Sequence, residues 1–370
     1  MKLTDVVDRI NGNVDRFTTE LEYYIGGEHF ESNELEVTQK GLLKENLGKL
    51  GFKFHFAFQD RDVVFMARNP HLRKAGMVRF AGLCSDASYI LRSKDETVLS
   101  QEYLAVMLQS DHFWDYCESH KVGSVNFANN WSSIANYEFE LPTPEEQKEI
   151  SDQVWAAYRL KQSYKKLLAA TEEMVKSQFI EMFKHKRPNG KIADLVDVNI
   201  KSVKKSFNKE DMIEYIDISS VNAKNRTLNE TTQYIVASAP SRAQQCVQNG
   251  DILVSTVRPI NRNVAVVNRN LTNLVASTGF CVLRPIDGYR EYLLAIVTSD
   301  KYTEKMCDIA SGGLYPAVNN SDVLSYDIFI PDKDFLHRVT QIYQQADKSG
   351  FELRKSIDAI DAVIKSLINN

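Results

Sequence analysis

Two stretches of the sequence resemble one another and decide the fold. GDILVSTVRPINRNVAVV, residues 250–267, places the turn formers and cations of RPINRN between two runs of small and β-branched residues. DVVFMARNPHLRKAGMV, residues 62–78, has nearly the same arrangement in the first half of the chain. Runs of this composition on either side of a Pro- and Asn-containing turn are typical of a β-hairpin. Each half of the chain is therefore predicted to carry a hairpin with a polar, cationic tip.

The two halves stay in register well beyond these hairpins. Asp62 aligns with Asp251, an offset of 251 − 62 = 189, and a drift of one residue brings Asn129–Asn130 onto Asn319–Asn320. Matches spread over ~80 residues at one offset indicate a tandem duplication. The further pairs at this offset are Pro70 and Pro259, Arg73 and Arg262, Glu102 and Glu291, Ser110 and Ser299, Gly123 and Gly312, and Leu141 and Ile330.

Each half also has the same predicted order of elements. An early strand precedes the hairpin, a further β-rich run follows it, and a short helix and a last strand come next. For the first half these are residues 23–30, 85–92, 102–119 and 137–142; for the second they are residues 214–221, 277–285, 291–310 and 326–331.

A long helix is predicted after each of these units. Residues 143–186 contain no glycine and a single proline, Pro144, at the favoured first turn, and apolar residues recur every three or four positions. Residues 332–370 show an even more regular apolar stripe. A helix of about 42 residues would extend ~60 Å, too far for a small β-rich domain to cover its stripe. The two stripes are expected to bury each other, although two helices that each pack on their own domain remain an alternative.

The fold class that follows is α+β. We expect two β-rich domains related by a pseudo-twofold axis and separated by two long antiparallel helices that form a coiled coil. The predicted divisions are residues 1–142 for the first domain, 143–187 for the first helix, 188–331 for the second domain and 332–370 for the second helix.

Composition excludes several classes of protein. The five cysteines are scattered without a CxxC pair and the seven histidines do not cluster, so neither a disulfide framework nor a metal site is expected. No apolar run approaches the ~18 residues that span a membrane, and we expect a cytoplasmic protein. The sequence contains no phosphate-binding GxxxxGK[ST] loop and no GxSxG elbow. We therefore predict a protein that is not an enzyme and binds no cofactor of its own.

The hairpin tips are the first candidate for recognition of nucleic acid. The net charge of −4 argues against binding of phosphates, but residues 61–79 hold five cations against one acid. Arginine pairs with guanine and asparagine with adenine in the major groove, so a shared frame with different tips suits a reader of two base sequences. Solvated turn residues are the alternative. The predicted DNA-binding residues of the tips are Arg68, Asn69, His71, Arg73 and Lys74, and Arg258, Asn261, Arg262 and Asn263.

The glycine turn before each last strand is a second candidate. KVGSVNFANNW in the first half and SGGLYPAVNNSD in the second combine glycines, which allow close backbone approach, with paired asparagines. The same asparagines could instead cap a helix or form a turn. The candidates on this surface are Asn129, Asn130, Tyr315 and Asn319.

In combination these motifs resemble the specificity subunit of type I restriction–modification systems. The resemblance is carried by the residue 250–267 hairpin, ASTGFCVLRP, SGGLYPAVNNSDVLSYDIFIP, LPTPEEQKEI and KSQFIEMF, and it extends over both halves. The first half departs from the pattern, with MARNPHLRK and VGSVNFANN at the two candidate surfaces.

The resemblance implies a non-catalytic subunit with two target recognition domains. Each domain would read one half of a split sequence in double-stranded DNA, and the helices would set the spacer. The same helices would dock two methyltransferase subunits, which bind S-adenosylmethionine, while restriction subunits would use ATP and Mg. The residues predicted to contact these partners are Tyr164, Leu168, Phe179 and Phe183.

Two other functions fit the same repeats and helices. One is a coiled-coil scaffold that holds two protein-binding modules and never binds DNA. The other is a specificity partner of a fused methyltransferase–nuclease.

Overall fold

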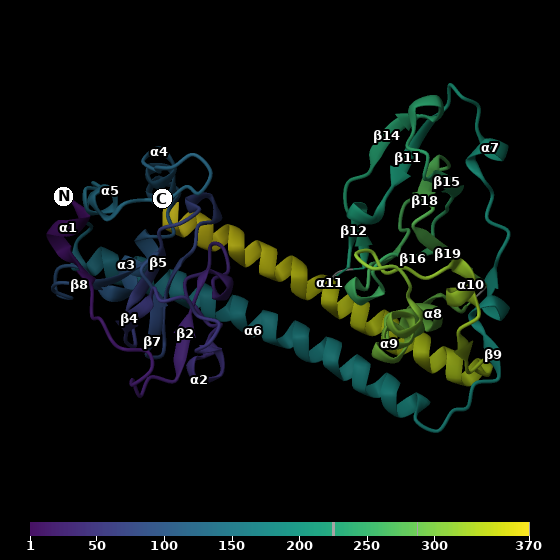
Figure 1. Cartoon of the computed structure of the whole chain (residues 1–370), viewed down its shortest axis with the longest axis horizontal. Helices are drawn as coiled ribbons and strands as arrows, with labels where there is room; N and C mark the ends of the chain where they lie inside the picture. Colours follow the sequence, from purple (N-terminus) through teal and green to yellow (C-terminus); the bar gives the residue numbers. More distant parts are fainter. Residues whose placement is uncertain (224–225, 287, 370) are drawn as a thin grey trace. The chain divides into compact units, whose positions relative to one another are not determined.

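A computed structural model of the chain describes residues 1–223, 226–286 and 288–369 and divides it into two compact units (Figure 1). Unit 1 comprises Met1–Leu167 and Leu353–Asn370, and unit 2 comprises Leu168–Glu352. The divisions fall inside the two long helices, α6 (Pro144–Phe183) and α11 (Lys333–Asn369). Each unit therefore contains part of both helices. The domain limits drawn from the sequence stay predictions, and Asn370 lies outside the described residues.

Unit 1 contains two four-stranded sheets. The first has the order β1-β8-β5-β6, with all neighbours antiparallel. The second has the order β3-β2-β7-β4, in which β2 and β7 are parallel and the β4–β7 pairing is interrupted by a bulge. The strands are β1 (Val7–Ile10), β2 (Tyr23–Ile25), β3 (Gly41–Leu42), β4 (Phe54–Phe58), β5 (Val63–Met66), β6 (Ala75–Met77), β7 (Gly82–Ser85) and β8 (Ser88–Ser93).

Unit 2 repeats both four-stranded sheets with the same strand order. Its sheets have the orders β10-β19-β16-β17 and β14-β11-β18-β15, with one parallel pair, β11–β18, and a bulge between β15 and β18. The tandem duplication and the mixed α+β class predicted from the sequence are therefore confirmed. The strands are β10 (Val196–Asp197), β11 (Met212–Ile216), β14 (Thr232–Ile235), β15 (Ala243–Cys246), β16 (Ile252–Ser255), β17 (Val264–Val266), β18 (Leu274–Ser277) and β19 (Phe280–Pro285).

The helix predicted after the sheets is in fact a pair of helices in each unit. The pairs are α3 (Gln101–Met107) with α4 (Asp111–Ser119), and α8 (Arg290–Val297) with α9 (Asp300–Ile309). Ser110 and Ser299 start the second helices, because their side chains accept hydrogen bonds from backbone amides three residues later. The prediction of one continuous helix missed this capping signal.

The end of each repeat brings two more corrections. The last strand predicted for residues 137–142 of unit 1 is wrong, because only Glu138 forms a β-bridge there, with Lys2. In unit 2 the predicted last strand is present as β20 (Asp327–Ile328), which pairs with β9 (Gly190–Lys191). Asn130 and Asn319 occupy the N-cap positions of the short helices α5 (Trp131–Ala135) and α10 (Asn320–Leu324). The offset therefore remains 189 without the one-residue drift.

The remaining elements are short and lie mostly in the loops around the sheets. They are α1 (Leu3–Val6), η1 (Gly27–His29), α2 (Leu43–Asn46), η3 (Ile192–Leu195), α7 (Val203–Ser206), η4 (Ile218–Ser220) and η5 (Val236–Ser238), with strands β12 (Val221–Asn222) and β13 (Thr227–Leu228).

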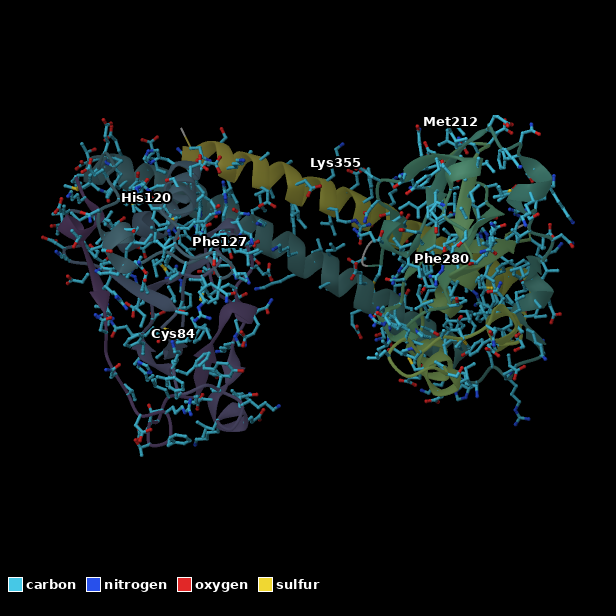
Figure 2. All side chains as sticks on the ribbon, turned by 45° about the horizontal axis from the view of Figure 1, so that its top comes forward. Cys84, His120, Phe127, Met212, Phe280 and Lys355 are labelled. Carbon is cyan, nitrogen blue, oxygen red and sulfur yellow. The ribbon has the colours of Figure 1, made fainter. Side chains whose placement is uncertain are left out.

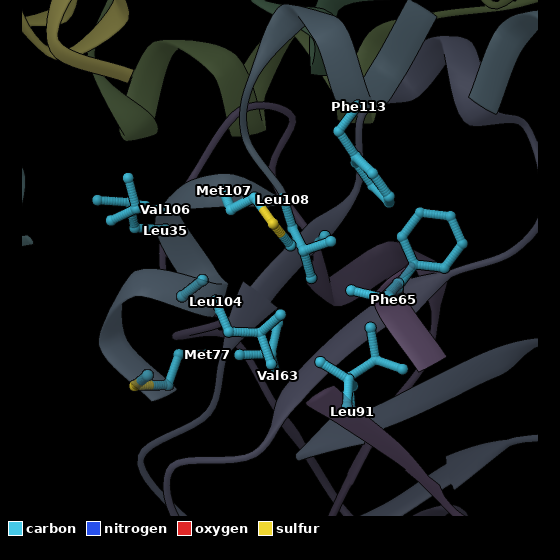
Figure 3. Close-up of a cluster of buried hydrophobic side chains, with 14 of the residues drawn as sticks. Leu35, Val63, Phe65, Met77, Leu91, Leu104, Val106, Met107, Leu108 and Phe113 are labelled. Carbon is cyan, nitrogen blue, oxygen red and sulfur yellow. The ribbon is translucent and has the colours of Figure 1, made fainter. Parts of the chain in front are cut away.

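The core of each unit lies between its first sheet and its helices. In unit 1, Val63, Phe65 and Leu91 of the sheet pack with Leu104 and Phe113 of the helices (Figure 3). The same core takes in Val154, Trp155 and Tyr158 of α6 and Ile364 of α11. In unit 2, Val339 and Tyr343 of α11 pack with Phe179 and Phe183 of α6. Each core is therefore completed by a helix that begins in the other half of the chain.

Inside each unit the two helix segments contact one another. In unit 2 the rings of Phe183 and Phe335 and those of Phe179 and Tyr343 lie 5.3 Å apart, so the segments run antiparallel there. In unit 1, Lys161 forms an ion pair with Asp361 at 2.5 Å. The apolar stripe predicted for α6 is not buried throughout, because Leu160 and Met174 are about half exposed. A coiled coil over the full helices stays a prediction.

The duplicated turn before β5 and β16 gives a direct test of backbone strain. Gly250 has φ +93°, and the equivalent residue in unit 1, Arg61, has φ +69°. A Cβ at Gly250 would meet no atom within 4 Å, so Gly250→Ala should act only through its backbone angle. We expect a loss of about 1 kcal/mol in the free energy of unfolding, measured by urea denaturation. Gly313→Ala is the matched control, because Gly313 also has open space but no positive φ; an equal loss in both variants would contradict the strain argument.

Candidate nucleic-acid interface

The hairpin tip of unit 1 has a defined shape. Between β5 and β6 the chain forms a 3₁₀ turn, η2 (Pro70–Leu72), closed by a hydrogen bond of 2.9 Å from the Arg73 amide to the Pro70 carbonyl. Asn69 and Arg73 flank the turn with φ values of +54° and +47°. Proline favours this geometry because its ring fixes φ for the first residue of the turn.

The tip of unit 2 has the same backbone with different side chains. Its 3₁₀ turn is η6 (Pro259–Asn261), flanked by Arg258 at φ +49° and Arg262 at φ +51°. A non-glycine residue in this left-handed region costs about 1 kcal/mol. Because this geometry occurs four times, at equivalent positions of the two tips, the two tips share one backbone frame.

The glycine turn before α5 or α10 adjoins each hairpin tip. The Asn69 amide donates to the Phe127 carbonyl at 2.8 Å (Phe127 is labelled in Figure 2), and the Arg258 amide donates to the Pro316 carbonyl at 2.7 Å. Gly123 and Gly312 allow these turns with φ values of +109° and +106°. The two surfaces that were predicted separately are therefore one composite surface in each unit.

In unit 2 this surface presents an arginine that is held by an aromatic ring. The Arg258 guanidinium lies 4.5 Å from the centre of the Tyr315 ring and donates to the Leu314 carbonyl at 3.2 Å. Stacking on an aromatic face orients a guanidinium and leaves other N–H groups free to donate. Leu314 and Tyr315 are 85% and 68% exposed, and Asn261 of the tip is also exposed, whereas Asn263 is half-buried.

In unit 1 the equivalent surface has different chemistry. At the offset of 189, Asn69 replaces Arg258 and Asn126 replaces Tyr315. Arg68 and His71 are exposed and Asn69 is half-buried, and Val125, which stands at the position of Leu314, is 83% exposed. The two tips thus share one backbone frame and offer different donors and acceptors.

Three further cations among the predicted DNA contacts, besides Arg258, have side-chain partners inside their own unit. Arg73 pairs with Asp111, and Arg262 pairs with Asp300 at 2.6 Å. The ammonium of Lys74 donates to the Gly27 carbonyl at 2.6 Å. These contacts mean that Arg73, Arg262 and Lys74 shape the tips, a role that the sequence did not predict.

Asn129 is buried, so its prediction as a DNA contact needs correction. Only 1% of it is exposed, its side-chain nitrogen donates to the Cys117 carbonyl at 2.7 Å, and its backbone carbonyl accepts from the Tyr89 hydroxyl at 2.8 Å. An alignment at the constant offset of 189 would have indicated this, because it pairs Asn129 with Val318, which is buried in unit 2. Asn130 and Asn319 are exposed next to the composite surfaces.

The comparisons with known proteins agree on one kind of protein. No family model matches the chain. Over 116 residues, 30% of the chain, the sequence is 32% identical to the specificity subunit of the type I restriction enzyme HindI from Haemophilus influenzae, and the match spans a quarter (25%) of that protein. The type I restriction–modification S subunit from M. genitalium has a TM-score of 0.56 at 10% identity, covering 100% of this chain and 94% of its own.

A second solved structure belongs to work on complex assembly and conformational transition of the type I R-M system. It has a TM-score of 0.54 at 16% identity and covers 100% of this chain and 95% of its own. This chain resembles the type I specificity subunits. The resemblance stated from the sequence is confirmed.

Within this specificity-subunit fold, two of the predicted partner contacts also pack inside unit 2. Phe179 packs on Tyr343, and Phe183 packs on Phe335 and Tyr292, so both pack against the core of unit 2. Both side chains remain half-buried, and as docking residues they stay predictions. Tyr164 and Leu168 are half-buried on α6 and stay predictions.

A buried polar cluster holds α6 in unit 1 of this specificity-subunit fold. Glu34 is buried and forms ion pairs of 2.8 Å with both Lys161 and Lys165, and Lys161 also pairs with Asp361 of α11. Burial alone would raise the pKa of Glu34, but the hydrogen bonds from the two lysines outweigh it and hold the pKa below its ordinary value. The apolar periodicity used to find the helix carries no signal of this cluster.

Two negative findings apply to the described residues. No group of three or more His, Cys, Asp or Glu side chains there is arranged to hold a metal ion. No described helix is both long and apolar enough to cross a membrane.

Proposed function

We propose that the chain is the DNA specificity subunit of a type I restriction–modification complex. Each unit reads one half of a split target in double-stranded DNA. The long helices set the distance between the half-sites and dock two methyltransferase subunits, and restriction subunits join this complex. The support is a duplicated fold shared with type I S subunits, together with the partial sequence match to one of them.

The observation that carries this proposal is the difference between two tips built on one frame. Arg258 over Tyr315 offers a fixed fork of donors, which is the arrangement that pairs with the O6 and N7 atoms of guanine. Asn69 and Asn126 occupy the same positions in unit 1, and an asparagine amide pairs with the N6 and N7 atoms of adenine. Two tips with the same backbone and different side chains suit a target whose two half-sites differ in sequence better than one whose half-sites are identical.

Lysines near α7 supply a surface for phosphate contacts in unit 2. Lys201, Lys204, Lys205 and Lys209 are exposed within nine residues, and Glu210 is the first acid to follow them. Contacts of this kind position a protein on DNA without reading its sequence. They also make a net charge of −4 compatible with DNA binding, because the cations are gathered on one segment.

Catalysis belongs to the partner subunits in this proposal. The methyltransferase subunits would bind S-adenosylmethionine, and the restriction subunits would use ATP and Mg. The specificity subunit itself would bind neither cofactor and would contribute target choice alone.

Methylome sequencing of the host with and without this gene tests the function. We expect methylation at one bipartite motif to disappear when the gene is deleted and to return when it is restored. An unchanged methylome, together with no salt-dependent binding of duplex DNA by the chain and its partner subunits, would favour the scaffold function instead.

A further inference from the structure

A Lys-Ser dipeptide recurs in the two long helices at the offset of 189. It comprises Lys176–Ser177 in α6 and Lys365–Ser366 in α11. The first copy belongs to the KSQFIEMF motif, which lies outside both the hairpin tips and the glycine turns. In unit 2 the Lys176 ammonium pairs with Asp300 Oδ2 at 2.6 Å, and in unit 1 the Lys365 ammonium lies 3.5 Å from Asp111 Oδ2.

Each of these aspartates also binds the arginine of a hairpin tip. Asp300 Oδ1 pairs with Arg262, and Asp111 Oδ1 pairs with Arg73. In both units, therefore, Oδ1 of the aspartate faces the arginine and Oδ2 faces the lysine. Both aspartates are the first residue of their helix, where a negative charge also interacts favourably with the helix dipole.

The lysine and the arginine of each set come from different halves of the chain. In unit 2 the tip belongs to the second half and Lys176 to the first, and in unit 1 the tip belongs to the first half and Lys365 to the second. Unit 1 adds a further tie, because the Asp111 amide donates to the Asn369 side chain at 2.6 Å. The contact is therefore duplicated and reciprocal.

We propose that Lys176 and Lys365 are positioning residues, each of which fixes a hairpin tip on the long helix that comes from the other half of the chain. The Lys–Asp–Arg set transmits the rotation and register of that helix to the tip. An effect of this Lys–Asp–Arg set on the choice of DNA spacer rests on the proposed function. The contact between helix and tip does not depend on that function.

The charges of these groups are consistent with the contact. Hydrogen bonds from Lys176 and Arg262 lower the pKa of Asp300, and the hydrogen bond from Arg73, with the charge of Lys365, lowers the pKa of Asp111. The side chains of Lys176 and Lys365 are 49% and 69% exposed, so solvent screens both pairs. The lysines therefore act on the orientation of the tips with little effect on overall stability.

Hydrogen exchange of the full chain tests the contact without DNA. Amides that close the tips report on it, namely those of Arg258, Asn261 and Arg262 in unit 2 and those of Asn69, Leu72 and Arg73 in unit 1. Lys176→Ala should speed exchange about threefold in the unit 2 tip and leave the unit 1 tip unchanged. Lys365→Ala should act only on the unit 1 tip, and less strongly, because its ion pair is longer.

Two other lysines provide matched controls. Lys184→Ala removes a cation directly after the end of α6, whose ion pair is local, with Glu181 in the last turn of that helix. Lys355→Ala removes an exposed cation of α11, labelled in Figure 2. Neither control should alter exchange at either tip. If Lys176→Ala leaves the unit 2 tip unchanged, or speeds both tips equally, the proposal is overturned.

A second arm measures the consequence for DNA. With the partner subunits present, methylation is compared on targets that carry the preferred spacer and on targets with one base pair added or removed. In both lysine variants, the ratio of methylation on the preferred spacer to methylation on the altered spacers should fall several-fold. The control variants should keep this ratio unchanged. If each lysine variant speeds hydrogen exchange at its own tip but the spacer preference is unchanged, the positioning role is overturned. Failure of the unmodified chain to bind DNA would instead refute the proposed function and leave the exchange result standing.

Discussion

Asp251→Ala is expected to lower the free energy of unfolding of unit 2 by about 3 kcal/mol. Asp251 is 1% exposed, and its two carboxylate oxygens accept hydrogen bonds of 2.9 and 2.8 Å from the Arg284 guanidinium. One of them also accepts from the backbone N–H of Gln248 at 2.9 Å. Alanine would leave the guanidinium, only 18% exposed, without its counter-ion at the base of the hairpin. Removing one member of such a pair lowers stability by more than the pair contributes to it, because the remaining charge is left buried without a partner.

The duplication supplies the matched variant. Asp62 makes the same bidentate contact with Arg92 in unit 1, but Arg92 is 37% exposed, so water can replace part of the lost interaction. Asp62→Ala should therefore lower stability less than Asp251→Ala does. The double variant Asp251→Leu with Arg284→Met should lose less than Asp251→Ala alone, since it leaves no buried charge.

The two units can be followed separately during urea unfolding. All three tryptophans, Trp114, Trp131 and Trp155, lie in unit 1, so their fluorescence reports unit 1 alone, while far-UV circular dichroism reports both units. Asp62→Ala should shift the fluorescence transition, and Asp251→Ala should shift only the part of the dichroism transition that fluorescence does not follow. A change below about 1 kcal/mol for Asp251→Ala would refute the argument from burial.

The repeated frame could be predicted from the sequence because local residues set it. Pro70 and Pro259 begin the 3₁₀ turns, and Gly123 and Gly312 provide the positive φ of the second turn. Ser110 and Ser299 are N-caps. Each of these residues determines backbone geometry within a few positions, so its recurrence at one offset reveals the duplicated fold without knowledge of distant contacts.

The orientation of single side chains could not be predicted in the same way. Whether Arg73 faces DNA or Asp111 depends on two residues 38 positions apart in the sequence and on the helix that brings them together. Asn129 and Asn130 are identical neighbours, yet one is buried and the other exposed, because the chain enters α5 between them. The contribution of each long helix to the core of the other half is likewise a tertiary effect, which apolar periodicity alone does not encode.

Arg258→Ala should remove the base preference of one half-site only. A bidentate contact from arginine to guanine contributes about 1–3 kcal/mol of discrimination, and the loss should appear at one base position of the half-site read by unit 2. Methylation by the complete complex is measured on targets with each position of both half-sites varied in turn. Preference in the other half-site should not change, because the unit 1 tip is intact.

Conservative variants separate base reading from phosphate contact. Arg258→Lys keeps the charge but lacks the planar fork, so it should lose discrimination nearly as fully as alanine while keeping more of the overall affinity. Tyr315→Phe retains the ring under the guanidinium and should behave as the unmodified chain does, whereas Tyr315→Leu removes the support and should weaken discrimination. Asn69→Ala, at the equivalent position of unit 1, should affect the other half-site. If Arg258→Ala instead weakens methylation equally on every sequence, Arg258 contacts phosphate, and the bases of that half-site are read elsewhere on unit 2.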